Sequence, residues 1–227
     1  MNDPHSWLPS VLALILLASV ATAGLLAARI PAPLQALTAI ARAAVQLALL
    51  SIVLAGVITD LRWVVIALAV MLSVAVYTAA RRARTSPASI PRLAYAIVSG
   101  PLAVLVIVFA TGALEFSPRY LLAVGGIVTG GAMTIAILTE RLLRVAVTDH
   151  WDQVEGWLAL GASPRQSVAP YAREAVRTAL MPAIDQTRTT GIVVMPGAFV
   201  GAVFAGASPL EAGRFQLIVL AGILAAG

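Results

Sequence analysis

Two polar residues lie inside otherwise apolar sequence and are the first candidates for chemistry. Arg42 and Gln46 are four residues apart within the stretch Ala36–Ile58, so a helix would place both on one face, toward a single cavity. A guanidinium and an amide together could hold an anionic or chelated solute. A charged side chain at the centre of a membrane helix costs about 2.5–3.5 kcal/mol, so its presence needs a reason. The alternative to a solute site is that Arg42 extends to the lipid headgroups and that Gln46 bonds a neighbouring helix.

Two later apolar stretches add candidates for a solute pathway. Tyr120–Thr139 contains hydroxyl and thioether side chains beside several glycines, and Thr187–Ala207 contains Pro196, which leaves the carbonyl of Ile192 without its helical donor. A kink at that proline could act as a hinge, and thioether sulfur is a soft metal ligand. Close helix packing by the glycines and core packing by the methionines are the alternative explanations. The candidate pathway residues are Arg42, Gln46, Thr129, Met133, Met195, Pro196 and Gly197.

The composition excludes several other kinds of chemistry. The chain contains no cysteine, which rules out disulfides, thiolate nucleophiles and zinc sites with cysteine ligands. All 15 basic residues are arginine, so the lysine of a P-loop is absent, and we predict that the chain is not an enzyme and binds no cofactor itself. The acids Asp60, Glu115, Glu140 and Glu211 lie near the ends of apolar stretches, so a full ligand set for a bare metal ion at membrane depth is not available.

The same composition assigns the chain to a membrane. Of its 227 residues 60% are apolar and 11% are charged, and the mean hydropathy is +0.96, a balance that water-soluble domains do not show. A net charge of +5 spread over the chain is too small for a nucleic-acid surface and indicates orientation in a bilayer instead. We therefore expect an all-α, polytopic transmembrane helix bundle.

Apolar runs of about 20 residues predict the spanning helices, because that length crosses the hydrocarbon core. The first run lacks the basic start of a signal peptide, so we expect a retained helix. A seventh run begins near Phe215 and reaches Gly227 after 13 residues, which is too short to cross, so we expect a chain that is cut short. The six full runs are Leu8–Ala28, Ala36–Ile58, Trp63–Ala80, Leu93–Gly112, Tyr120–Thr139 and Thr187–Ala207.

The distribution of arginine predicts the orientation. Four arginines lie between the third and fourth runs, and six lie from Arg141 to Arg188, the last of them at the start of the sixth run. The even-to-odd connections hold one each: Arg62, Arg119 and Arg214. Because positive residues stay on the cytoplasmic side, the N-terminus is expected outside.

The one long polar segment, about 141–186, is expected to be cytoplasmic within a single permease domain, 1–227. Trp151, Val154, Trp157 and Leu158 recur at the spacing of one helix face. Gly161 should end that helix. The run Ser163–Gln166 reads as a capping box with proline at the first helical position, and Met181–Pro182 should mark the junction of the second helix with the next span. The segment is thus predicted to form two short helices that a partner could receive; a helix pair lying on the headgroups is the alternative.

Several motifs resemble those of one family. The interval from Glu155 to Gly161 resembles the cytoplasmic loop by which ABC transporter permeases contact their ATPase. Five ordered motifs of the chain resemble those of the FetB-type ABC transporter permeases, bacterial iron-export proteins with plant relatives linked to aluminium tolerance. One departure is Gly131, where the family usually has asparagine. The motifs are Ala41–Leu47, Leu158–Pro164, Arg177–Pro182, Gly191–Gly197 and Phe204–Gly206 with Pro209 and Gln216.

The resemblance implies the membrane half of a transporter in the plasma membrane, namely the bacterial inner membrane, exporting iron or another metal species. Its partners would be a P-loop ATPase that binds ATP and Mg, a second permease copy and membrane lipid, with no nucleic acid. The resemblance does not identify which residues would bind the metal. The expected ATPase-coupling residues are Glu155, Trp157, Leu158, Leu160, Gly161, Ala162 and Ser163.

Two other functions compete with this one. An ATP-independent secondary transporter or channel would predict acids within the membrane and, in many folds, an inverted repeat, and neither is evident in the sequence. A membrane anchor for a soluble partner would use the segment Trp151–Pro182 and would tolerate leucine at Arg42 and Gln46.

Overall fold

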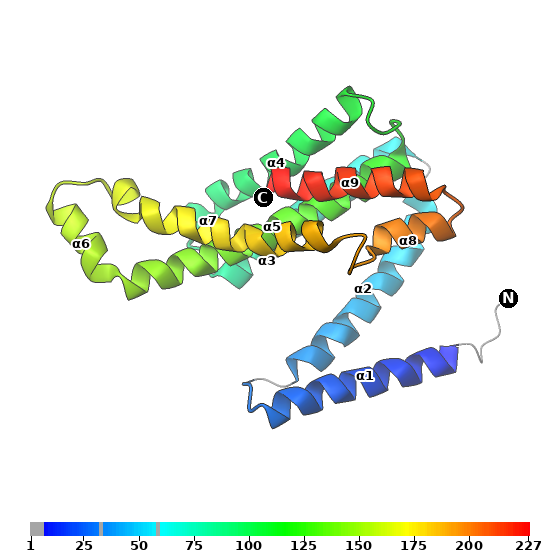
Figure 1. Cartoon of the computed structure of the whole chain (residues 1–227), viewed down its shortest axis with the longest axis horizontal. Helices are drawn as coiled ribbons and strands as arrows, with labels where there is room; N and C mark the ends of the chain where they lie inside the picture. The colour runs from blue at the N-terminus through cyan, green and yellow to red at the C-terminus, as the bar shows by residue number, and fades with distance from the viewer. Residues whose placement is uncertain (1–6, 32–33, 58–59) are drawn as a thin grey trace. The chain divides into compact units, whose positions relative to one another are not determined.

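All regular structure in the described residues is helical, apart from one isolated β-bridge between Thr190 and Val194. The computed structural model describes residues 7–31, 34–57 and 60–227. The helices divide into two units, Met1–Val57 and Ile58–Gly227 (Figure 1). The predicted all-α class is therefore confirmed for the described part of the chain.

The first unit consists of two apolar helices, α1 (Trp7–Ala27) and α2 (Gln35–Val57). They match the first two predicted spans to within one or two residues; Ile58, where the second span was expected to end, lies outside the described residues. α1 is long and apolar enough to cross a membrane, and the stretch Gln35–Ser51 of α2 is also apolar.

The second unit is built around one long helix. α5 (Pro118–Asp149) packs against four other helices of this unit, α3, α4, α7 and α9 (Figure 1). Among the described helices, α1, α3, α4, α5 and α9 have the length and apolar composition of membrane spans. The chain is a multi-pass membrane protein. The second unit contains α3 (Leu61–Ala83), η2 (Pro87–Ser89), α4 (Ile90–Ala110), α5, α6 (Trp151–Ala159), α7 (Pro164–Thr189), α8 (Gly197–Phe204) and α9 (Pro209–Ala226).

Glycines on α5 and α9 let these helices approach closely. A Cβ on Gly131 would lie 2.9 Å from the Cγ2 of Ile223, and a Cβ on Gly222 would lie 2.9 Å from the Cγ1 of Val104. Such distances are shorter than carbon–carbon contacts allow, so any larger residue would force Ile223 or Val104 to shift. Gly130, by contrast, has no atom within 4 Å of its Cβ position. Packing therefore explains part of the α5 glycine pattern and leaves Gly130 without a packing role.

Two arginines of α5 close the end of α3. The Nη2 of Arg141 donates to the carbonyl of Arg82 at 3.1 Å, and Arg144 donates to the carbonyls of Ala83 and Arg84. The last carbonyls of a helix have no partner within it, and these guanidiniums satisfy them. The contact brings the arginines near the end of α3 and the two arginines of α5 to the same end of the second unit.

The expected span Thr187–Ala207 is wrong as one helix. α7 does not end at Met181–Pro182 but continues through this pair to Thr189, and the chain then turns before α8 begins at Gly197. In the turn, the Thr189 carbonyl accepts from the backbone amides of the residues at 192, 193 and 194, and Gly191 adopts a φ of +87°. A left-handed backbone of this kind favours glycine and interrupts the helix.

The break lies near the middle of the neighbouring span. α7 passes the C-terminal end of α9 at Leu180, whose Cδ2 would lie 3.1 Å from a Cβ on Gly227. From there to Thr189 is about 13 Å of helix, and α8 runs about 12 Å from the break to the α8–α9 turn. Together they match α9, whose 18 residues extend about 27 Å.

The last helix is longer than its apolar run suggested. α9 begins at Pro209 rather than near Phe215, because Ser208 and Glu211 form a capping box that starts it six residues earlier. Its 18 residues are long and apolar enough to span a membrane, so the expectation of a helix too short to cross is wrong.

The two adjacent glycines of α5 provide a test of this packing. We expect Gly131→Leu to lower the stability of the chain by about 1–3 kcal/mol, because its side chain must displace Ile223 of α9. Gly130→Leu, with no neighbour at its Cβ, should leave stability unchanged or raise it. The measurement is the loss of monodisperse protein in detergent on heating; equal melting of the two variants would contradict the assigned α5–α9 contact.

Candidate functional site

The turn between α6 and α7 has a fixed backbone conformation. Gly161 has a φ of +89°, its amide bonds the carbonyl of Leu158 at 3.0 Å, and the Ala162 amide bonds the carbonyl of Trp157 at 3.0 Å. These two bonds form a Schellman motif, which satisfies carbonyls at the end of α6. Gly161 therefore ends α6, as the sequence predicted.

α7 begins immediately after this turn with a capping box. The amide of Ser163 donates to the Oε1 of Gln166 at 2.8 Å, and the amide of Gln166 donates to the Oγ of Ser163 at 3.4 Å, with Pro164 at the first helical position. The predicted capping box is therefore confirmed. Both helix ends at the turn are closed by local hydrogen bonds, so the turn is rigid without support from elsewhere.

Side chains also fix α6 against α7. Val154 of α6 is buried, and the hydroxyl of Tyr171 donates to the Oε1 of Gln153 at 2.8 Å. The ring of Tyr171 stacks on His150, with the ring centroids 5.2 Å apart. α6 and α7 therefore move as one body with the end of α5.

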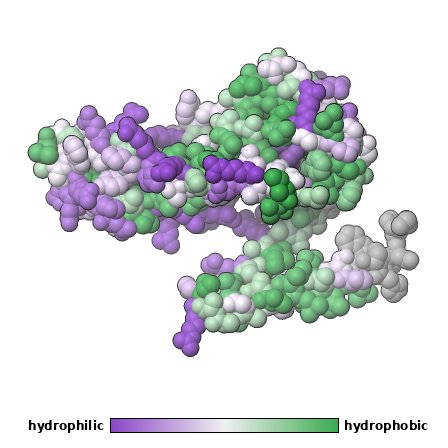
Figure 2. Space-filling model, in the orientation of Figure 1, coloured by the Kyte–Doolittle hydropathy of each residue, from purple (hydrophilic) through white to green (hydrophobic). Residues whose placement is uncertain are grey.

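The turn presents large apolar side chains to its surroundings. Trp157 is 56% exposed, Leu160 is 83% exposed, and Glu155 and Leu158 are exposed as well. Around them the surface of α6 and the first half of α7 is mainly hydrophilic, in contrast to the apolar surface of the spans (Figure 2). Exposed tryptophan and leucine on a rigid polar support are typical of a protein-docking surface. We call residues 155–163 the α6–α7 turn surface.

The predicted apolar face of α6 is only partly a packing face. Of its members Val154 is buried, whereas Trp151, Trp157 and Leu158 are exposed. The period of the apolar residues predicted the helix but not which of them are buried, because α6 contacts only α5 and α7 among the described elements and most of its surface has no neighbour.

The candidate pathway residues do not all come together. Arg42 and Gln46 lie exposed on one face of α2 in the first unit. Thr129 is buried in α5, and Met133 packs beside the buried cluster of α3, α4 and α5. At the break, Met195 is 78% exposed, Pro196 is buried and Gly197 begins α8. The expected kink at Pro196 is wrong, because this residue precedes α8 and does not interrupt a continuous helix.

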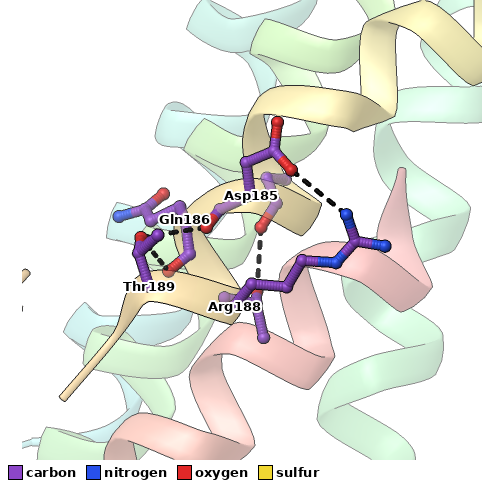
Figure 3. A network of polar contacts seen from close by, with 6 residues as sticks. Asp185, Gln186, Arg188 and Thr189 are labelled. Atoms are coloured by element: carbon purple, nitrogen blue, oxygen red, sulfur yellow. Dashed lines mark hydrogen bonds and ion pairs between the residues drawn. The ribbon is translucent and has the colours of Figure 1, made fainter. Parts of the chain in front are cut away.

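A polar cluster at the end of α7 was missed by the sequence argument. The Nη1 of Arg188 lies 3.4 Å from the Oδ1 of Asp185, and the Thr189 hydroxyl donates to the Asp185 carbonyl at 2.9 Å (Figure 3). Asp185 and Arg188 did not stand out in the sequence, because the helix was expected to end at Met181–Pro182 and so the two residues were not placed on one continuous helix. The continuous α7 instead places them beside α9, next to the break. Exposed charges at this depth indicate contact with water or protein rather than lipid.

The described residues offer no group of three or more His, Asp or Glu side chains that could hold a metal ion. Among them, Gln216 of α9 is buried with its Oε1 lacking a hydrogen-bond partner. An unpaired buried acceptor costs about 1–3 kcal/mol, so Gln216 is a further candidate for a functional residue.

Several known proteins are similar to this chain. The membrane protein STAR2 of Oryza sativa subsp. japonica is 38% identical over 188 residues, which cover 82% of this chain and 66% of the relative. ALUMINUM SENSITIVE 3 of Arabidopsis thaliana is 35% identical over 70% of this chain and 58% of its own length. The Escherichia coli protein named "Probable iron export permease protein FetB" is 34% identical over 55% of this chain and 48% of its own length.

The aligned parts thus span between about half and two thirds of these relatives. No solved structure matches the chain significantly. The family model described as "Uncharacterised protein family (UPF0014)" matches residues 8–227. Since this match covers nearly the whole chain, and the FetB-type permeases and their plant relatives align with it, the chain belongs to the UPF0014 family of membrane proteins.

Proposed function

We propose that the chain is the permease subunit of an ABC transporter that exports iron or another metal species. A separate P-loop ATPase, which binds ATP and Mg²⁺, would drive it. The observation that carries this proposal is the α6–α7 turn surface: apolar, exposed and rigid, at the far end of α5 from the α4–α5 connection. The name of the Escherichia coli relative supplies the candidate cargo.

The connections of the second unit suggest how force would reach the membrane. α7 runs without interruption for 26 residues, about 39 Å, from the turn to the break. Displacement of the turn by a closing ATPase would therefore move the charged end of α7 and the break beside α9. In our proposal two copies of the chain pair, each turn seats in one ATPase subunit, and ATP binding draws the turns together.

The orientation follows from the same arrangement. The arginines at the end of α3, Arg81, Arg82 and Arg84, and Arg141 and Arg144 of α5 lie at the end of the second unit that also carries the α6–α7 turn. Under the positive-inside rule this end faces the cytoplasm, with the N-terminus outside. We place the protein in the plasma membrane, as a bacterial inner-membrane protein, because an ATPase partner requires cytoplasmic ATP.

We propose pathway roles for residues of each unit separately. Arg42 and Gln46 would offer donors to an oxyanion, and the Asp185–Arg188 pair lies where α7 gives way to irregular backbone. Irregular backbone within a bilayer occurs where it is covered by protein or lines an aqueous cavity. We assign Thr129 and Met133 of α5 to the part of the pathway in the second unit.

One observation favours a second candidate, an ATP-independent transporter. Broken helices form the substrate sites of many secondary transporters, and α7 and α8 are two such halves. Reconstitution with the ATPase separates the candidates: export that requires ATP and the partner supports the ABC permease, and export driven by an ion gradient without the partner supports the alternative.

The turn glycine gives the first functional test. Gly161→Pro should abolish substrate-stimulated ATP hydrolysis by the complex, because proline cannot adopt a φ of +89° and removes the amide that bonds Leu158. Leu160→Asp should do the same without touching the backbone, since this side chain is 83% exposed. The readout is ATP turnover of vesicles that contain the chain and its co-purified ATPase.

Gly130→Ala is the control, because Gly130 is helical, lies in α5 outside the α6–α7 turn surface and has no atom within 4 Å of its Cβ position. It should insert, bind the ATPase and stimulate hydrolysis as the wild type does. Normal stimulation in Gly161→Pro and Leu160→Asp would remove the turn from the coupling mechanism.

The α2 pair gives the second functional test. We expect Gln46→Leu to lower ATP-driven flux about fivefold, the equivalent of one hydrogen bond, with the yield of assembled protein unchanged. Leu47→Ala, on an exposed neighbour, should affect neither quantity. Flux into inverted vesicles is compared with dimer yield from the same membranes; parallel losses in Gln46→Leu would show that the amide only packs helices together.

A further inference from the structure

A cavity of about 530 Å³ opens in the second unit at the end opposite the α6–α7 turn. It lies between the α4–α5 connection, the first turn of α5 and the α8–α9 hairpin. Four charged side chains line it, namely Glu115, Arg119, Glu211 and Arg214. We call it the outer cavity. It is large enough for a small organic ligand.

Aromatic contacts and a helix cap hold the walls of the outer cavity. Phe116 packs edge-on against Phe109, with centroids 5.3 Å apart, and so fixes the connection that carries Glu115. Tyr120 of α5 contacts Phe215 of α9 at 5.8 Å between centroids. The carboxylate of Glu211 accepts from the amide of Ser208 at 3.1 Å, which fixes the start of α9. The charges are therefore presented from anchored backbone rather than from a loose loop.

The charges of the outer cavity balance but do not pair. In the described part of the chain the ion pairs are Glu174–Arg177 and Asp185–Arg188, both on α7, so neither cavity guanidinium lies within 4.0 Å of a carboxylate. Because these carboxylates and guanidinium groups do not pair with one another, both kinds of group are available to bind a ligand. A ligand that complements them presents a cationic centre to Glu115 and Glu211 and oxyanions to Arg119 and Arg214.

The donor set excludes a bare metal ion as that ligand. Two carboxylates are too few for the six ligands that octahedral cations take, and one Glu211 oxygen is already engaged with Ser208. A metal ion that brings its own carboxylate ligands complements both the negative and the positive side chains of the cavity. The glutamates face the metal, and the guanidinium groups of the arginines bind the carboxylates of the chelator.

We propose that the outer cavity binds a metal ion complexed by a small carboxylate chelator. The inference rests on the proposed transport function and names the chemical form of its substrate. The cavity is then the site at which the complex enters or leaves the transporter, on the side opposite the ATPase.

The test is equilibrium binding to the purified full chain in detergent, without ATPase. Radiolabelled ferric citrate is the probe. The wild type should bind it saturably, and Glu115→Gln and Arg214→Gln should each weaken binding about tenfold or more, as for the loss of a charge-assisted contact. Glu211→Gln should weaken it too while still folding, because glutamine also completes a capping box. Glu174→Gln and Arg177→Gln, exposed on α7, should leave affinity unchanged.

Two further probes decide the ligand class. Citrate alone and Fe²⁺ alone should each bind at least about tenfold more weakly than the complex, since each satisfies charges of one sign only. Equal affinity for citrate alone or for Fe²⁺ alone, wild-type affinity in the cavity variants, or no binding of ferric citrate would each overturn the proposal.

Flux measurements separate this inference from the proposed function. If ATP-driven iron export by the reconstituted complex keeps its wild-type KM in Glu115→Gln and Arg214→Gln, the cavity proposal fails and the transporter assignment stands. If these variants lose ferric citrate binding but no iron species moves with ATP in the wild type, the transporter assignment fails and the outer cavity remains a binding site.

Discussion

Hydrocarbon offers no hydrogen-bond partner to a peptide group, and this constraint governs the structure. The spans are helices for that reason. Where a helix ends, side chains or turn amides form the hydrogen bonds that the helix no longer supplies. Arg141 and Arg144 bond the last carbonyls of α3, a Schellman motif and a capping box close the α6–α7 turn, and threonine hydroxyls bond the final carbonyls of α7. The departures from helix are thus few, and they coincide with the regions proposed to act.

Length and hydropathy predicted most of the membrane architecture, because both follow from the thickness of the bilayer. They failed over 187–207, where a continuously apolar run hides a break. An apolar sequence indicates burial in lipid or protein but carries no information about the backbone angle φ. The residues that indicated the break were Gly191, which adopts a left-handed conformation, and Pro196, which directly precedes α8. At α9 the apolar run began six residues after the helix did, because Glu211 and Arg214 interrupt it while the Ser208 cap sets its start.

Local chemistry predicted the α6–α7 turn in detail, since glycine, serine, proline and glutamine at these spacings specify a single backbone path. Contacts between distant segments were beyond the same reasoning. The outer cavity joins Glu115 to Arg214 across about a hundred positions of sequence, and only the α4–α5 and α8–α9 connections at one end of the bundle bring them together. Asp185 and Arg188 were likewise placed correctly only by the continuous α7.

The central claim is that a separate ATPase grips the α6–α7 turn surface, and site-directed cross-linking tests it most directly. The chain has no cysteine, so Leu160→Cys and, at the opposite end of the second unit, Leu210→Cys each introduce one reactive thiol on an exposed side chain. The account predicts that Leu160→Cys cross-links to the co-expressed ATPase in an ATP-dependent manner and that Leu210→Cys does not. Labelling of Leu160→Cys by an impermeant reagent from outside intact cells, without cross-linking to the ATPase, would contradict it.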